Sequence, residues 1–257
     1  MFIDTHTHIY SEQFDIDRNE AIKRAISKNI KIMLLPAIDK SYSEKLINCT
    51  KSFPKNCFPM LGLHPTSVKE NYKEEIDFIK SEITNYNYIA IGETGLDYYW
   101  SQTFVKEQEI ALREQIELAI NYNLPIVLHS RNSLNEIFDI LKDYRNERLT
   151  GVFHCFQGNT FDAEKVIELG FFLGIGGVVT YKSSTMADVV KNISLEHIVL
   201  ETDSPYLSPV PHRGKRNEST NIKIIAEKIS EIKQISINKV EEITTCNTIK
   251  LFNLKNV

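Results

Sequence analysis

Short apolar runs alternate with longer amphipathic stretches along the whole chain, and this alternation limits the folds that it can form. Runs this short predict buried strands. Between them, apolar residues recur at helical spacing, most clearly over Val105–Tyr122 and in Leu134, Ile137, Phe138 and Leu141. The expected strands are Phe2–Thr5, Ile30–Leu35, Phe58–Leu61, Tyr88–Ile91, Pro125–Leu128, Gly151–Phe153, Phe171–Leu173 and Ile198–Glu201.

The eight strand–helix alternations show no break in composition, so we expect one domain over residues 1–257. They predict an α/β fold, a single (β/α)8 barrel of the TIM type. An open doubly wound sheet is the alternative. The tail from Thr220 to Asn253 predicts extra C-terminal helices, because one face of it carries Ile222, Ile225, Ile229 and Ile232.

Composition is that of an ordinary soluble globular protein, with 42% hydrophobic and 25% charged residues. A net charge of −4 argues against a broad basic face for nucleic acid. It does not exclude a phosphate substrate, because bound cations would supply local positive charge.

The beginning of the chain lacks a basic segment followed by an apolar one, so no signal peptide is expected. No apolar run reaches membrane-spanning length. The four cysteines form no CxxC pair and predict reduced thiols in a cytoplasmic protein: Cys49, Cys57, Cys155 and Cys246. Cys155 is expected to face away from its neighbour His154, because successive side chains on a strand alternate.

Polar side chains follow the apolar runs at the points where the strands are expected to end. His6 and His8 are two residues apart, so an extended chain points both the same way. The full set is His6, His8, Glu93, His129, His154 and Asp203. Imidazoles and carboxylates are ligands for divalent metals. In a barrel the carboxyl ends of all strands meet at one mouth, whereas an open sheet would separate the first strand from the eighth.

Each of these residues also has a simpler interpretation. His129 and His154, taken singly, resemble hydrogen-bonded core histidines. Asp203 precedes Ser-Pro and suits a turn. Glu201 lies two residues before Asp203, so the two carboxylates share a direction, one as a ligand and the other as its support.

Three further residues are candidates for substrate binding. His64 ends the third strand, where it could bind substrate or cap the loop. Arg131 follows His129 by two, which should turn it into the same mouth. Arg213 lies in the basic segment 211–217, which follows the eighth strand, where barrels often bind phosphate. Arginine suits phosphate oxygens, although a solvated loop is the alternative interpretation of this segment.

Seven ordered segments resemble the TatD-type metal-dependent deoxyribonucleases, a branch of the amidohydrolase superfamily. They are Asp4-Thr5-His6-Thr7-His8, Gly62-Leu63-His64-Pro65, Ile91-Gly92-Glu93-Thr94-Gly95-Leu96-Asp97-Tyr98, His129-Ser130-Arg131, His154-Cys155-Phe156-Gln157-Gly158, Glu201-Thr202-Asp203-Ser204-Pro205-Tyr206-Leu207 and Pro211-His212-Arg213-Gly214-Lys215-Arg216-Asn217-Glu218. The set covers nearly the whole chain. It departs from the family pattern at Ser219, where proline is expected, and at Gln157, where serine is more usual.

The resemblance implies two divalent metal ions. The first would be held by His6, His8, Glu93 and Asp203, and the second by Glu93, His129 and His154, with Glu93 as the bridge. Magnesium is the family expectation. Manganese and zinc also suit a set so rich in histidine, and ligand softness alone favours zinc.

The resulting hypothesis is hydrolysis of a phosphodiester, with an exonuclease-like action on single strands or ends of DNA. Two cations would stabilise the attacking and leaving oxygens. Glu93 and Asp203 would be catalytic, and Asp203 would orient the water or take its proton. His64, Arg131 and Arg213 would neutralise phosphate oxygens. We expect a monomer. The alternatives are a metal-dependent hydrolase of a small-molecule amide, lactone or aminoacyl ester, and a non-catalytic metal-binding barrel used for protein contacts.

Overall fold

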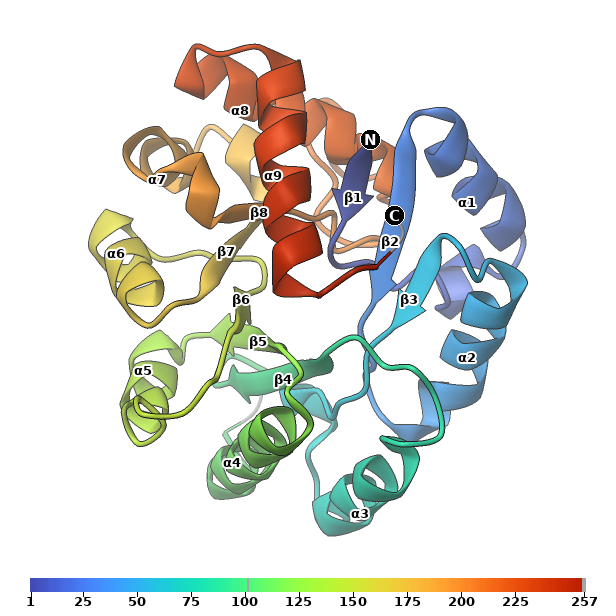
Figure 1. Cartoon of the computed structure of the whole chain (residues 1–257), viewed down its shortest axis with the longest axis vertical. Coiled ribbons are helices and arrows are strands. Elements are labelled where there is room, and N and C mark those ends of the chain that lie inside the picture. Colours follow the sequence, from blue (N-terminus) through green and yellow to red (C-terminus); the bar gives the residue numbers. More distant parts are fainter. Residues whose placement is uncertain (101, 256–257) are drawn as a thin grey trace.

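Eight parallel strands form a ring with helices outside it, in the computed structural model that describes residues 1–100 and 102–255 (Figure 1). The strands are β1 (Phe2–Asp4), β2 (Ile30–Leu35), β3 (Cys57–Pro59), β4 (Ile91–Asp97), β5 (Ile126–Arg131), β6 (Gly151–Phe153), β7 (Phe172–Ile175) and β8 (Ile198–Leu200). The helices are α1 (Arg18–Ser27), α2 (Ser43–Ser52), α3 (Tyr72–Glu82), α4 (Val105–Tyr122), α5 (Leu134–Lys142), α6 (Thr160–Glu168), α7 (Met186–Asn192), α8 (Ile222–Lys233) and α9 (Ile237–Leu251).

The ring is closed by two isolated bridges between two runs of paired strands. One run is β1-β2-β3 and the other is β4 to β8, each in chain order. Leu61 bridges to Ile91 at one junction, and Thr7 bridges to Ser204 at the other. This order confirms the barrel and rules out the open sheet, in which the first and last strands would lie far apart.

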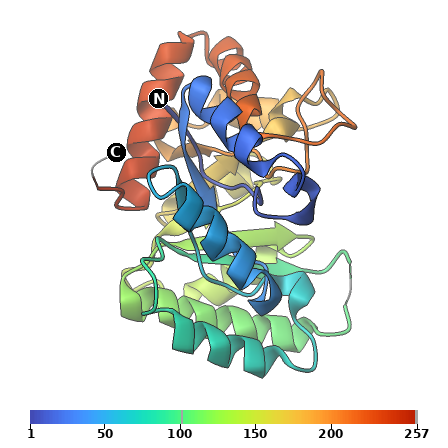
Figure 2. The ribbon, with the colours of Figure 1, turned by 90° about the vertical axis from the view of Figure 1, so that its right-hand side faces the viewer.

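The inside of the ring is filled by apolar side chains and is closed at one end by α9. The strands supply Ile3, Ile32, Leu34, Val127, Val152 and Val199, and Met60 directly follows β3. The end of α9 supplies Leu251, and Phe252 follows it. Asn247 on α9 donates to the carbonyl of Ile198 at 2.8 Å, at the start of β8. Figure 2 shows α9 at one end of the barrel and the loop after β8 at the other. Only the carboxyl ends of the strands are therefore open for a site.

The two extra helices of the tail are confirmed as α8 and α9, with Ile222, Ile225 and Ile229 buried. Helix α4 covers the predicted range, Val105–Tyr122. None of the helices described is long and apolar enough to span a membrane.

The predicted bounds of the fourth strand were wrong, because β4 continues through the glycines to Asp97. A Cβ atom at Gly92 would lie 2.6 Å from the Cβ of Val127, and one at Gly95 would lie 2.0 Å from the carbonyl oxygen of His129. These glycines therefore let β4 lie unusually close to β5, so that Glu93 lies within the strand and not after it.

Four charged residues join α1 to the segment after β8. The guanidinium of Arg216 lies 2.6 and 2.8 Å from the two carboxylate oxygens of Asp17. Arg24 Nη2 lies 2.9 Å from Asp17 and 2.8 Å from Glu218. Hydrogen bonds from Arg216 and then Arg24 hold the pKa of Asp17 well below its usual range. Arg216, from the basic segment, is therefore occupied by a structural contact.

Replacement of Asp17 by asparagine is expected to lower the free energy of unfolding by about 1 kcal/mol, since it removes the charge shared by both arginines. A carboxylate with a depressed pKa stabilises the fold above its unfolded-state pKa, so this contribution should shrink as the pH falls below ~4 and vanish only below the depressed folded-state pKa. Urea unfolding at pH 7 and pH 3 measures both effects. The control is Asp15→Asn, since Asp15 is 51% exposed, pairs with Arg18 three residues along the chain and lies 4.0 Å from Lys45; an equal loss in the control contradicts the prediction.

Candidate metal centre

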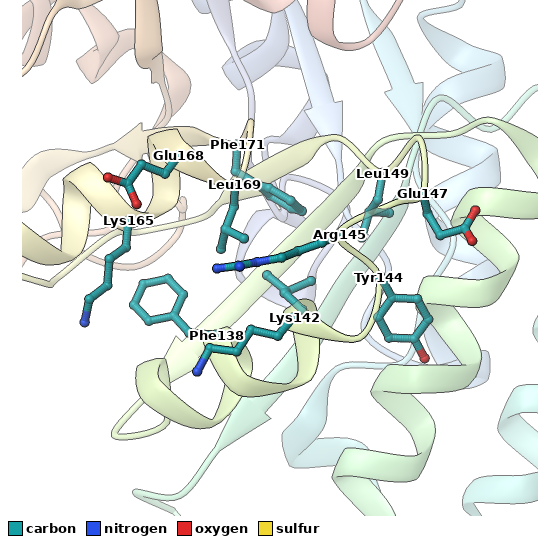
Figure 3. Close-up of a pocket in the computed structure, with 11 residues that line it drawn as sticks. Phe138, Lys142, Tyr144, Arg145, Glu147, Leu149, Lys165, Glu168, Leu169 and Phe171 are labelled. Carbon is teal, nitrogen blue, oxygen red and sulfur yellow. The ribbon is translucent and has the colours of Figure 1, made fainter.

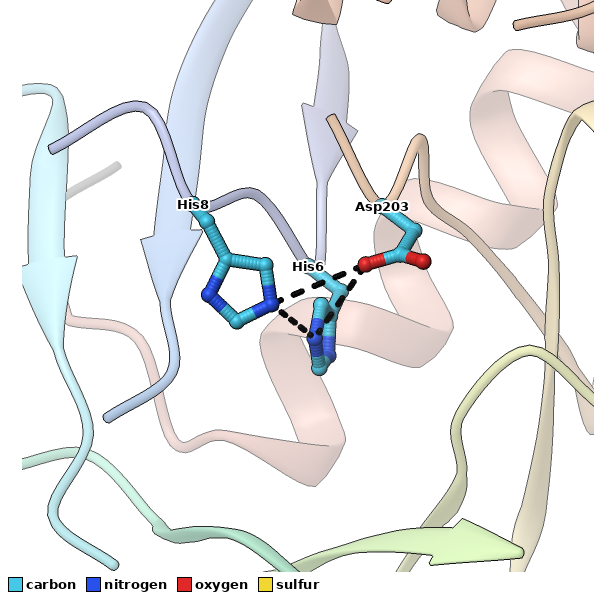
Figure 4. Close-up of side chains that lie close together, drawn as sticks. All are labelled: His6, His8 and Asp203. Carbon is cyan, nitrogen blue, oxygen red and sulfur yellow. Dashed lines mark hydrogen bonds and ion pairs between the residues drawn. The ribbon is translucent and has the colours of Figure 1, made fainter. Parts of the chain in front are cut away.

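Three of the predicted ligands converge from the first and eighth strands, as Figure 4 shows. His6 and His8 follow β1, and Asp203 follows β8. The two Nε2 atoms lie 3.3 Å apart, and Asp203 Oδ1 lies 3.6 Å from that of His8 and 3.9 Å from that of His6. The Asp203 amide donates to the His6 carbonyl at 2.9 Å, which fixes the two loops against each other.

Glu93, which is only 2% exposed, adds a carboxylate to this group. Its Oε2 atom lies 3.0 Å from His6 Nε2 and 3.5 Å from His8 Nε2. Two donors bound to one ion at about 2.1 Å in tetrahedral geometry are themselves about 3.4 Å apart. The separations among these side chains thus fit a cation with nitrogen and oxygen ligands.

The other oxygen of Glu93 faces a second set of histidines. Oε1 lies 2.9 Å from His129 Nδ1, 3.2 Å from His64 Nε2 and 3.8 Å from His154 Nε2. Each carboxylate oxygen therefore meets a different group of imidazoles. This arrangement suits a carboxylate that joins two cation positions.

The second group differs in detail from the expected set of Glu93, His129 and His154. The compact cluster of donor atoms contains His64 with Glu93 and His129, whereas His154 clusters with His6 and Glu93. The rings of His154 and His6 are stacked, with centroids 3.4 Å apart. His64, which the sequence assigned to the substrate, is thus close enough to share a cation with His129. The orientation of the rings decides which histidine lies beside His129, and the spacing of the residues in the sequence does not specify that orientation.

Two carboxylates pair with ring nitrogens of the histidines and fix the orientation of the rings. Asp97 Oδ2 lies 2.9 Å from His129 Nε2, and Glu201 Oε2 lies 3.1 Å from His154 Nδ1. The sequence indicated the supporting role of Glu201 but assigned none to Asp97. The signal was present, because residues 93 and 97 share one face of a strand. It was missed because the strand was expected to end at Ile91.

Charge in the centre favours a cation. Burial raises the pKa of the Glu93 carboxyl, but His64, His6 and His154 outweigh it and hold this pKa well below its usual range. Burial lowers the pKa of His154, yet Glu201 and Glu93 together raise it to about 10. The carboxylates thus favour positive charge at this position, and a metal ion bound to His154 would displace its proton.

The orientation predicted for Cys155 was wrong. Strand β6 ends at Phe153, and Cys155 has a φ of 44°, so strand alternation no longer applies to it. Its thiol lies in a cluster with donor atoms of His154 and Glu201. The backbone amide of Cys155 donates to Glu201 Oε1 at 2.5 Å.

The centre opens into a cavity of about 570 Å³. Its walls include His8, His64, Glu93, His129, His154 and Asp203, together with Trp100 and Arg131. Arg131 therefore points into the mouth, as expected. Arg213 lines a separate hollow of about 510 Å³, which shares Tyr206 and Leu207 with the main cavity.

A further cavity of about 460 Å³ lies between α5 and α6, outside the barrel (Figure 3). Phe138, Leu169 and Phe171 line it, together with the carboxylates of Glu147 and Glu168, and none of its lining residues is a histidine. It therefore lacks the imidazoles of the barrel mouth.

The Gly174→Ala variant is expected to lose about 10- to 100-fold in metal affinity. A Cβ atom at residue 174 would lie 2.3 Å from Glu201 Oε2, and Glu201 is only 1% exposed. The carboxylate can move aside only by releasing His154. Isothermal titration with Mn²⁺ measures the loss.

Gly176→Ala is the matched control for this variant, because its Cβ would lie at an ordinary 3.5 Å from the backbone oxygen of Glu201. It should bind Mn²⁺ like the parent protein. Equal affinities in the two variants contradict a supporting role for Glu201.

Comparison with known proteins agrees with this geometry. Residues 3–253 match the family described as TatD related DNase. The uncharacterized metal-dependent hydrolase YabD of Bacillus subtilis is 34% identical over 99% of this chain and 100% of its own length. BU355 of Buchnera aphidicola, also an uncharacterized metal-dependent hydrolase, is 35% identical over 98% of this chain and 99% of its own.

Solved structures show the same fold. YjjV, a TatD homolog from Escherichia coli, superposes with a TM-score of 0.92 at 27% identity, over 98% of each chain. A TatD family hydrolase from Entamoeba histolytica gives 0.83 at 24% identity over 97% of each chain. With the barrel, the histidine–carboxylate centre and a family match over nearly the whole sequence, the chain belongs to the TatD family of metal-dependent hydrolases.

Proposed function

We propose that this chain is a deoxyribonuclease that hydrolyses phosphodiester bonds at ends or in single strands of DNA, using two divalent cations. One observation carries the proposal: Arg131 lies on the wall of the same cavity as the buried carboxylate and histidine centre. A phosphodiester brings negatively charged oxygens that arginine neutralises. A neutral amide or lactone has no such charge.

Each residue then has a defined task. Divalent cations, when bound, supply Lewis acidity and a hydrolytic water of lowered pKa. Glu93 would help to hold both cations, since its two oxygens face different groups of histidines. Asp203, 15% exposed and facing the cavity, orients the water and accepts its proton. Arg131 neutralises the phosphate under attack, and Arg213 contacts phosphates further along the strand.

The test is an assay of the purified chain on single-stranded and duplex oligonucleotides, with Mg²⁺, Mn²⁺ or Zn²⁺, beside a panel of amides, lactones and aminoacyl esters. We expect metal-dependent release of nucleotides, suppressed by a chelator. Turnover of the small molecules without DNA cleavage contradicts the proposal and favours the small-molecule alternative. Metal binding without any turnover favours the non-catalytic one.

The number of cations has its own test. Crystals grown with Mn²⁺ should give two anomalous peaks, one on each side of the Glu93 carboxylate. A single peak contradicts the two-cation scheme and leaves the hydrolase assignment intact.

A further inference from the structure

Two aromatic residues and an arginine form an exposed surface beside the metal centre. Tyr99 and Trp100 follow β4 and are 54% and 68% exposed. The guanidinium carbon of Arg131 lies 4.1 Å from the ring centroid of Tyr99 and 5.5 Å from that of Trp100. We call Tyr99, Trp100 and Arg131 the aromatic platform.

The aromatic platform is fixed to the metal centre through Asp97. Its Oδ1 atom accepts hydrogen bonds from the backbone amides of Tyr99 and Trp100, each at 3.0 Å. Its Oδ2 atom lies 2.9 Å from His129. One buried carboxylate thus sets the position of both the platform and a metal-centre histidine. A surface held this firmly is suited to place a bound group at a defined distance from the centre.

The aromatic platform also lies between two cavities. Trp100 and Arg131 line the metal cavity, whereas Tyr99 and Arg131 line a neighbouring hollow of about 520 Å³. The walls of that hollow include the amides of Asn132 and Asn135, which can donate and accept hydrogen bonds. A polymer with one phosphate at the metal centre therefore has room to continue across the platform.

We propose that the aromatic platform stacks an unpaired nucleobase next to the phosphate under attack, and that this contact selects single-stranded nucleic acid. The inference rests on the proposed function. Exposed aromatic rings with an arginine bind every base through its π face, largely without regard to sequence. In a duplex the base faces are already stacked on one another, so no free base face is available to stack on the platform.

The chain contains a single tryptophan, so the fluorescence of Trp100 reports directly on the platform. The first experiment titrates the whole protein with a single-stranded thymidine oligonucleotide in Ca²⁺, which keeps a cation at the metal centre for the phosphate while slowing cleavage. A second titration uses the same oligonucleotide with abasic residues at its terminal positions. We expect quenching by the first and little by the second.

The second experiment compares cleavage of the two oligonucleotides by the parent protein and Trp100→Ala in Mn²⁺. The variant should raise KM about tenfold on the base-bearing strand, change kcat less than twofold, and leave KM for the abasic strand unchanged. Tyr86→Ala is the matched control, because Tyr86 is 39% exposed with Lys51 at 5.4 Å but lies outside the cavities. It should behave like the parent.

The outcomes separate the two proposals. Normal DNA cleavage without quenching, or an equal loss on both oligonucleotides, overturns base stacking and leaves the nuclease standing. Base-dependent quenching without any cleavage supports the platform and overturns the nuclease. Quenching by neither oligonucleotide, together with no cleavage, overturns both and leaves the exposed rings to a protein partner.

Discussion

Replacement of Glu93 by glutamine is expected to lower kcat by about a thousandfold or more and to reduce the number of bound cations from two to one. The two carboxylate oxygens face different groups: Oε2 lies near His6 and His8, and Oε1 lies near His64 and His129. Glutamine keeps the shape but offers only one oxygen. One group must then face an NH2 group, which cannot bind a cation.

The measurement pairs steady-state kinetics with metal analysis of the purified variant by mass spectrometry. Glu117→Gln is the control, since Glu117 is an exposed residue of α4 that does not line the metal cavity. It should keep both cations and full activity. A Glu93→Gln protein that binds two cations, or that cleaves DNA at the parent rate, contradicts the bridging role of Glu93.

The parts of the site that follow from strand periodicity could be predicted from the sequence. His6 and His8 lie together because an extended chain turns residues two apart the same way. Asp203 meets them because a closed ring makes the first strand a neighbour of the eighth. In both cases the fold class and the spacing were sufficient.

The parts that depend on ring orientation or on loop paths could not be predicted. Whether His64 or His154 completes the cluster around His129 depends on side-chain torsions. The path after β8 depends on Asn217, whose side chain donates to the carbonyls of Thr202 and Tyr206 at 2.8 and 2.7 Å. With the loop held in this way, Arg213 lies outside the main cavity, although the residue comes after the eighth strand in the sequence.

Asp97 shows how one wrong boundary conceals a contact. The apolar run ends at Ile91, so the strand was expected to end there, before Gly92 and Gly95. In the barrel the same glycines allow β4 to approach β5. The carboxylate two residues beyond Gly95 then reaches His129, and the aromatic platform follows directly behind it.

Replacement of Asp203 by asparagine is expected to lower kcat by about 100- to 1,000-fold, with the fold and both cations retained. Asp203 has a φ of 55°, a conformation that asparagine adopts readily, so the loop should keep its path. The amide still offers one oxygen toward His6, His8 and His154. It cannot accept a proton from the attacking water, and this is the function that the variant removes.

Kinetics and metal content together distinguish this role from a purely structural one. The Asp203→Asn protein should bind two cations and keep KM for the oligonucleotide within about threefold of the parent value, since substrate contacts are unchanged. Asp203→Ala serves as the comparison, because alanine is strained at this φ and offers no oxygen; it should lose metal as well as turnover. If Asp203→Asn keeps the parent kcat, the proton goes elsewhere, and Asp203 acts only as a ligand.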